Sequence, residues 1–208
     1  MPAALLGTAA VSAALPIRPG GPQAKPVIRV GVIDDQSGPY RDVNGPTSIA
    51  CARQAIHEVA PGAFNVQVLT ADHQNKPTLA AVITKQWIDQ GHVDLIQDGA
   101  SSAAASAINA ICKERNEVFI PRSPATLDLT GKASTPHTIH WIYDSYTAAH
   151  STGGAMVKAG GDTWLFVTPN YAAGIAFPRD TTRFVEGVGG KVLGGAANQR
   201  APAIADIG

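Results

Sequence analysis

The chain has 208 residues, of which 45% are hydrophobic and 15% charged, and this balance gives a globular protein enough apolar material for a core. Sixteen basic residues match sixteen acidic ones, so the formal net charge is zero. The charge balance excludes the strongly basic surface with which proteins bind nucleic acids or anionic membranes.

The first 26 residues differ from the rest of the chain. Residues 3–15 are small or apolar, carry no charge and are too few to span a bilayer. This pattern is typical of the core of a secretory signal peptide, with residues 11–13 (VSA) as a small-x-small cleavage site. Because no basic segment precedes it, a flexible tail is the alternative. Residues 16–26, rich in Pro and Gly, are predicted to form a linker.

Short apolar strands then alternate with amphipathic helices. Strands are expected at residues 27–34, 64–70, 93–97 and 118–120, and helices at residues 47–59, 77–90 and 101–115. This rhythm predicts an α/β fold, a doubly wound parallel sheet with helices on both faces. Such folds bind ligands beyond the carboxyl ends of the strands. The loops at 35–46, 71–76, 98–102 and 121–128 are therefore candidate binding loops.

The same rhythm begins again in the second half of the chain. Strands are expected at residues 138–142, 163–168 and 191–193, and helices at residues 148–159 and 175–188. We expect a signal-like segment with linker (1–26), a first α/β lobe (27–142) and an incomplete second α/β lobe (143–208). Two strand–helix units close a core poorly, and residues 194–208 are rich in Ala and Gly without a clear period. The pattern therefore predicts a C-terminally truncated chain.

Neither metal binding nor catalysis is predicted. Asp34 and Asp35 are adjacent carboxylates at a strand end, but no third ligand follows at a useful spacing. The six histidines form no HxH or HxxxH pattern, which argues against a zinc site. We therefore expect no catalytic residues and no cofactor.

The cysteines and tryptophans are interpreted as core residues. Cys51 and Cys112 lie in predicted helices among Ala and Ile, where free Cys behaves as a small hydrophobe, so both are expected to be buried and unpaired. Export would permit a disulfide as the alternative. Trp87, Trp141 and Trp164 fall in periodic elements and are expected to pack into the core.

Five stretches carry a family resemblance in their order and spacing, although no single motif is specific. They are IRVGVIDDQSGPY (28–40), the stretch from QWIDQG to NEVFI (86–120), TLDLTGK (126–132), TIHWIYDSY (138–146) and GGDTWLFVTPNYAAG (160–174). Together they resemble type I periplasmic binding proteins of the leucine/isoleucine/valine-binding family. The resemblance covers roughly residues 27–193.

The resemblance implies ligand contacts at the start of the third helix and in the loop after the fourth strand. Ser101 and Ser102 match the serine loop that holds a ligand carboxylate, and the unpaired N–H groups of a helix N-terminus suit an anion there. Capping of the helix by either serine is the alternative. In the second loop, Ser123, Ala125 and Thr126 match positions that offer hydroxyls and carbonyls to a ligand.

Three further residues belong to this interpretation. Tyr171 matches a tyrosine that lies against the ligand from the second lobe, and Tyr40 of the SGPY loop is a candidate for the cleft wall. Tyr40 as a rim residue that packs on Pro39 is the alternative. Arg122 is able to pair with a carboxylate, but we favour a solvated loop arginine.

The resemblance implies a non-enzymatic, extracytoplasmic (periplasmic) solute-binding protein of an ABC-type uptake system. Its ligand would be a small carboxylate (a branched-chain or other amino acid, an amide or an aromatic acid), and its partners the permease and ATPase subunits in the membrane. One alternative is a ligand-sensing domain of a receptor or regulator with this fold. Another is an α/β enzyme, although no G-x-S-x-G elbow or phosphate-binding loop is present. The truncated chain is expected to bind weakly.

Overall fold

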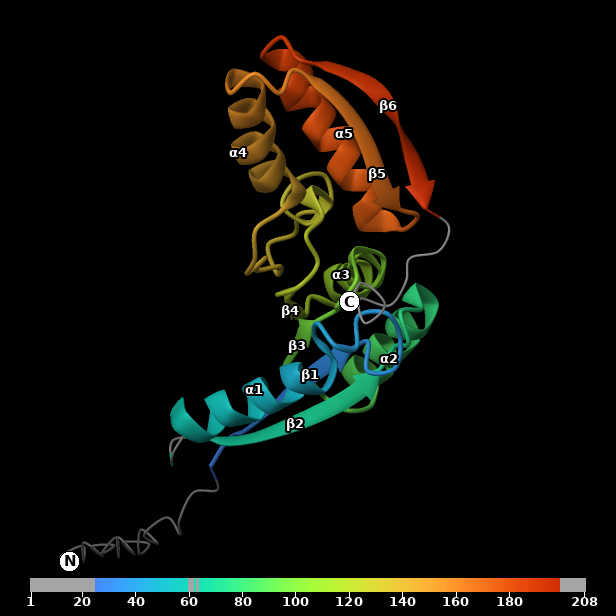
Figure 1. The fold of residues 1–208 in the computed structure, drawn as a ribbon. Coiled ribbons are helices and arrows are strands. Elements are labelled where there is room, and N and C mark those ends of the chain that lie inside the picture. The colour runs from blue at the N-terminus through green and yellow to red at the C-terminus, as the bar shows by residue number, and fades with distance from the viewer. Residues whose placement is uncertain (1–24, 60–61, 63, 199–208) are drawn as a thin grey trace, which may run out of the picture.

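A computed structural model describes residues 25–59, 62 and 64–198. The signal-like stretch and most of the linker, and the last ten residues, lie outside the described residues. Within the described part of the chain, no helix combines the length and apolarity needed to cross a membrane. Figure 1 shows two groups of elements, β1–β4 with α1–α3 and β5–β6 with α4–α5, which we name the N-terminal unit and the C-terminal unit.

The N-terminal unit is built on a four-stranded parallel sheet. Its strands are β1 (Val27–Asp34), β2 (Asn65–Asp72), β3 (Leu95–Asp98) and β4 (Val118–Ile120). They are ordered β2-β1-β3-β4, so β1 lies in the interior and its last five residues are buried. The register pairs Asp34 with Asp72 and Ile33 with Asp98, which brings the carboxyl ends of three strands to one edge.

Helices cover both faces of this sheet. Helices α2 (Pro77–Asp89) and α3 (Ser102–Arg115) pack on one face over Ile33, Ile96 and Phe119, which are fully buried. Helix α1 (Gly45–Val59) covers the other face over Val30 and Val32. The predicted α/β fold with a doubly wound parallel sheet is confirmed.

The C-terminal unit pairs two parallel strands, β5 (Thr163–Pro169) and β6 (Lys191–Asn198), with helices α4 (Ser145–Lys158) and α5 (Ala172–Gly187). Alternate residues of β5 differ in exposure: Trp164 and Phe166 are half-buried, whereas Leu165 and Val167 are 66% and 74% exposed. The β5–β6 sheet is therefore covered on one face only.

Two predicted strands have other lengths in the structure. Residues 138–142 form a single bridge, Thr138 to Phe119, because β4 ends at Ile120 and the next residue, Pro121, has no N–H to continue the ladder. Strand β6 instead continues five residues beyond the predicted Leu193, since pairing with the β5 backbone requires no side-chain pattern. The short 3-10 helix η1 (Leu127–Leu129) was not predicted.

Two expectations about buried side chains are wrong. Cys112 is buried and free, and burial raises the pKa of its thiol to about 12, but Cys51 lies on the exposed side of α1. Trp141 is 75% exposed because it follows the single bridge at Thr138 and belongs to no helix or strand. Trp87 does pack against the core of the N-terminal unit.

Candidate functional site

A cavity of about 500 Å³ lies between the two units, beyond the carboxyl ends of the strands. The four predicted binding loops, all in the N-terminal unit, supply most of its walls, and residues 143, 170, 171 and 173 supply the rest. Its lining residues are Pro39, Tyr40, Val43, Asn44, Asn75, Ala100, Ser102, Ser123, Pro124, Ala125, Tyr143, Asn170, Tyr171 and Ala173.

Five of the seven predicted ligand residues are brought together here: Tyr40, Ser102, Ser123, Ala125 and Tyr171. The other two, Ser101 and Thr126, are not among the lining residues. Each has a capping position instead: Ser101 Oγ accepts a hydrogen bond from Ala104 N at 3.2 Å, and Thr126 Oγ1 accepts one from Asp128 N at 3.2 Å. The predicted contacts to a ligand therefore stay predictions for all seven.

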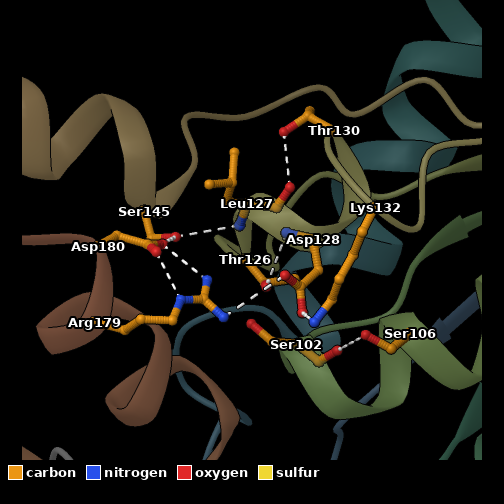
Figure 2. A network of polar contacts seen from close by, with 10 residues as sticks. All are labelled: Ser102, Ser106, Thr126, Leu127, Asp128, Thr130, Lys132, Ser145, Arg179 and Asp180. Carbon is orange, nitrogen blue, oxygen red and sulfur yellow. Dashed lines mark hydrogen bonds and ion pairs between the residues drawn. The ribbon is translucent and has the colours of Figure 1, made fainter. Parts of the chain in front are cut away.

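Ser102 stands at the first turn of α3 with an unused hydroxyl. It is 4% exposed, and its Oγ has no hydrogen-bond partner among the described residues. Its carbonyl accepts from Ser106 Oγ at 2.8 Å, one turn further along the helix (Figure 2). Only the N–H of Ala104 in this turn is taken by the Ser101 cap, and the helix dipole favours negative charge at this end. This end of the cavity is suited to an anion.

Two tyrosines meet across the cavity from the two units. The rings of Tyr40 and Tyr171 are 5.9 Å apart at an angle of 70°, an edge-to-face contact. Tyr171 immediately precedes α5, and Tyr40 belongs to the loop that follows β1. Burial, and then the neighbouring Tyr171, raise the pKa of Tyr40 above its ordinary value, so its hydroxyl is a neutral donor.

The loop that carries Tyr40 is held by the carboxylate of Asp35. This buried side chain accepts hydrogen bonds from Gly38 N at 2.7 Å and Tyr40 N at 2.9 Å. The turn requires glycine at 38, because a Cβ there would lie 2.5 Å from Asp35 Oδ1. Asp35, for which the sequence predicted no catalytic or metal-binding role, thus fixes a wall of the cavity.

Side chains at the end of β2 hold neighbouring loops in the same way. Asp72 accepts from Gln36 N at 3.0 Å and from Ser37 Oγ at 2.6 Å. Burial acts to raise the pKa of Asp72, but these bonds outweigh it and lower the pKa overall. His73 Nδ1 accepts from Asn75 N at 3.0 Å and so positions a lining residue. Burial lowers the pKa of His73.

The end of β3 holds the most connected carboxylate. Asp98 is fully buried, accepts hydrogen bonds from Ser48 Oγ, Ser123 Oγ and Asn44 Nδ2, and forms an ion pair with Arg122 Nη2 at 2.6 Å. The interpretation of Arg122 as a solvated loop residue is therefore wrong: its partner is this buried acid, which the sequence places 24 residues earlier.

Asp34 at the end of β1 lies beside this group. Its burial, and then the charge of Asp98, raise the pKa of Asp34 to about 8, so it holds its proton at neutral pH. Among the described residues, no group of three or more His, Cys, Asp or Glu side chains is arranged to hold a metal ion. Of the acids at the strand ends, Asp72 and Asp98 hold loops through their hydrogen bonds.

Sequence reasoning missed this supporting layer, although a signal was present. Three neighbouring strands each end in aspartate, at Asp34, Asp72 and Asp98, and the parallel register gathers these ends at one edge. It also missed the lining asparagines Asn44, Asn75 and Asn170, for which no pattern in the sequence was distinctive.

A second polar network beside the cavity links the C-terminal unit to η1, whose Leu129 packs into the core of the N-terminal unit (Figure 2). Ser145 Oγ donates to Asp180 of α5 and accepts from Leu127 N of η1 at 3.2 Å. Arg179 pairs with Asp180 at 2.7 Å and reaches Asp128 of η1 at 3.8 Å. Burial acts to raise the pKa of Asp180, but its bonds from Arg179 and Ser145 lower the pKa overall.

Comparisons with known proteins agree with this geometry. A family model described as "Periplasmic binding protein" matches residues 27–202. No curated protein matches the chain. Among solved structures, a periplasmic binding protein from Burkholderia mallei is 35% identical, with a TM-score of 0.80, over 85% of this chain and 48% of that one.

Two further solved structures are similar. A branched-chain amino acid ABC transporter periplasmic ligand-binding protein from Burkholderia xenovorans is 26% identical, with a TM-score of 0.72, over 82% of this chain and 46% of that one. A solute-binding protein of an ABC transporter from R. palustris, in complex with benzoate, is similar in fold at 20% identity and a TM-score of 0.77, over 85% and 49%. The chain thus spans about half the length of these proteins.

Proposed function

The chain belongs to the periplasmic binding protein family, and from that premise we propose that it binds a small carboxylate for an ABC-type uptake system. The two units would be the two lobes of the binding cleft, and the cavity between them its ligand site. The loaded protein would deliver its ligand, outside the cytoplasmic membrane, to a permease with ATPase subunits. Binding without catalysis is the proposed activity.

The observation that carries this proposal is the free hydroxyl of Ser102. A buried hydroxyl without a partner costs free energy, so its presence at the lining of a cavity favours a ligand that takes its proton. The free N–H groups of the first turn of α3 lie beside it, and the helix dipole adds to the attraction for negative charge. A carboxylate satisfies all of these groups together.

The remaining walls favour an apolar body on this carboxylate. Tyr40, Tyr143 and Tyr171 supply aromatic surface, and Pro39 and Pro124 supply rigid apolar surface. An aromatic ring or a branched aliphatic side chain would fill such a space. The ligands that the similar proteins' names state, branched-chain amino acids and benzoate, fall in these two classes.

Closure of the two units on the ligand is the expected mode of binding. Tyr40 of one unit and Tyr171 of the other would then lie on the two sides of the cleft, and their edge-to-face contact marks where the walls meet. Ser145 and Arg179 of the C-terminal unit also contact η1, at Leu127 N and Asp128, and these contacts would help to set the relative position of the units.

Thermal unfolding of the purified chain tests this proposal against a panel of amino acids, amides and aromatic acids. A ligand that binds only the folded chain raises its melting temperature. We expect a rise with carboxylates of one class and none with the matching primary amides. A melting temperature that no carboxylate raises would contradict the proposal.

A matched pair of variants tests the role of the α3 terminus. In Ser102→Ala, the unpaired hydroxyl is removed, so we expect unchanged or slightly higher stability but roughly tenfold weaker carboxylate binding. Ser106→Ala removes a hydroxyl one turn along the same helix, outside the cavity lining, and should leave affinity unchanged. Equal effects of the two substitutions on affinity would contradict the assignment of Ser102.

A further inference from the structure

One wall of the cavity is governed by a carboxylate that does not itself line the cavity. Asp98 is fully buried behind this wall, where side chains from two other segments converge on it. Asn44 and Ser48 approach from the start of α1, and Arg122 and Ser123 approach from the loop after β4. Two of these four, Asn44 and Ser123, line the cavity.

The side-chain donor protons of Asn44 and Ser123 are all used in hydrogen bonds to Asp98 or to each other. The hydroxyl of Ser123 has one proton, which it donates to Asp98 Oδ1. The Nδ2 group of Asn44 donates to Asp98 Oδ1 at 3.4 Å and to Ser123 Oγ. The groups left over are the side-chain amide oxygen of Asn44, Oδ1, which takes no hydrogen bond from the described residues, and a lone pair of Ser123 Oγ. Both of these are acceptors.

The charges around Asp98 fix the direction of the hydrogen bonds that Asn44 and Ser123 donate to it. Arg122 lies on Asp98 at 2.6 Å and stabilises its negative charge, while the adjacent Asp34 is held neutral by its burial. An ionised carboxylate is an acceptor only, so neither the Asn44 amide nor the Ser123 hydroxyl can reverse without losing its bond to a buried charge.

We infer that Asp98 sets the hydrogen-bonding polarity of this wall, so that the ligand must bring a donor, a hydroxyl or an ammonium, opposite Asn44 and Ser123 in addition to its carboxylate. The inference rests on the proposed function, since it takes the cavity as the ligand site. A carboxylate without a second polar group would leave the two acceptors unpaired when it displaces water from them. Asp98 is thus a positioning residue that determines specificity.

Two matched ligand pairs test this inference by isothermal titration calorimetry. 4-Hydroxybenzoate and benzoate differ by one hydroxyl, and L-leucine and 4-methylpentanoate differ by one ammonium. We expect the wild-type chain to prefer the donor-bearing member of at least one pair by about tenfold or more. Equal affinity for both members of every pair that binds would overturn the inference.

Substitution of Asp98 should remove this preference. In Asp98→Asn, the new amide can donate to Ser123 Oγ, which frees the serine proton to turn toward the cavity, so the preference should fall to within about threefold. Asp94→Asn, just before the start of the same strand, is the control and should keep the wild-type ratio. Ser123→Ala removes one acceptor from a half-buried position and should lower the ratio even if Asp98→Asn does not fold.

A measurement without ligand separates this inference from the proposed function. In the NMR spectrum of the free wild-type chain, the Asn44 side-chain amide protons should exchange slowly with solvent, and Asp98→Asn or Ser123→Ala should accelerate their exchange at least tenfold. Fast exchange in the wild-type chain would overturn the assignment of Asp98. Slow exchange together with no binding of any of the four compounds would support that assignment and count against the proposed function alone.

Discussion

The two units hold their shares of the cavity in different ways. In the N-terminal unit, each wall loop is tied to a buried group at a strand end, namely Asp35, His73 or Asp98. In the C-terminal unit, Tyr171 is 38% exposed and starts α5 without a side-chain cap. The wall from the N-terminal unit is therefore preorganised by buried hydrogen bonds, whereas Tyr171 in the other wall lies partly exposed at the surface of the C-terminal unit.

The core of the N-terminal unit is also more deeply buried than the core of the C-terminal unit. Ile33, Ile96, Ile108 and Phe119 are fully buried in the N-terminal unit, whereas Val185 is the only large apolar side chain below 2% exposure in the described part of the C-terminal unit. A sheet covered on both faces surrounds its side chains with packed atoms, and a two-stranded sheet covered on one face leaves every second side chain in solvent. The contrast predicts that stability resides mainly in the N-terminal unit.

The largest expected effect is the loss of a core side chain from the N-terminal unit. Phe119→Ala should lower the free energy of unfolding by about 3–5 kcal/mol, because it removes a fully buried ring that the core contacts on all sides. Val185→Ala in the C-terminal unit should cost only about 2 kcal/mol. Denaturant unfolding followed by tryptophan fluorescence measures both.

The tryptophans also show whether the units unfold together. Trp87 packs against the N-terminal core, while Trp164 lies in β5. Two single-tryptophan variants, one that keeps Trp87 and one that keeps Trp164, have the other tryptophans replaced by Phe. In these backgrounds Phe119→Ala should shift the unfolding midpoint reported by Trp87 the most, and Val185→Ala the midpoint reported by Trp164. Equal shifts of both transitions by both substitutions would contradict the contrast between the cores.

The next effect is a difference in the pH dependence of stability. The pKa of Asp34 is raised to about 8, so between about pH 4 and pH 8 the folded chain binds a proton that the unfolded chain has released. Stability from this group is complete below about pH 4 and is lost as the pH rises toward 8, by up to about 1.4 kcal/mol per pH unit. Asp34→Asn should lack this slope.

Asp180 in the C-terminal unit supplies the opposite case. Its pKa is lowered overall, so its contribution is present above the unfolded value of about 4 and is lost as the pH falls through the folded value. Asp180→Asn should therefore be less stable than the wild type at neutral pH and approach it in acid. Urea unfolding from about pH 2 to pH 9 measures both variants, and slopes of the same sign would contradict these assignments.

A pair of glycine substitutions should give effects of opposite sign in the two units. Gly38→Ala places a Cβ 2.5 Å from Asp35 Oδ1, which displaces the loop of Tyr40, so we expect a loss of about 1–3 kcal/mol of stability and roughly tenfold weaker ligand binding. Gly154→Ala, inside α4 with no atom near the new Cβ, should stabilise the chain by about 0.5–1 kcal/mol. Thermal unfolding and calorimetry distinguish the two, and destabilisation by Gly154→Ala would show that α4 is not an ordinary helix.

The strands and helices of the N-terminal unit could be predicted from the sequence, but the hydrogen bonds of its buried polar layer could not. The β-branched run of β1 and the helix signals around α2 and α3 are local, so periodicity located them within a few residues. The bond from Ser123 to Asp98 joins residues 25 apart in sequence, and that from Asn44 to Ser123 joins residues 79 apart. Only the parallel register brings such residues together, so no local pattern could have paired Arg122 with Asp98.

The smallest expected effect concerns the link between the units. Arg179 of α5 and Lys132 both pair with Asp128 of η1, at 3.8 Å and 3.1 Å, but only Arg179 connects the units. Because Arg179 and Lys132 are 48% and 74% exposed, Arg179→Gln and Lys132→Gln should each lower stability by less than about 1 kcal/mol. Their effects on coupling should differ: Arg179→Gln should widen the gap between the Trp87 and Trp164 transitions, while Lys132→Gln should leave that gap at its wild-type value. A wild-type gap in both variants would mean that the hydrogen bond from Leu127 N of η1 to Ser145 Oγ holds the units together without the arginine, since this bond remains in both.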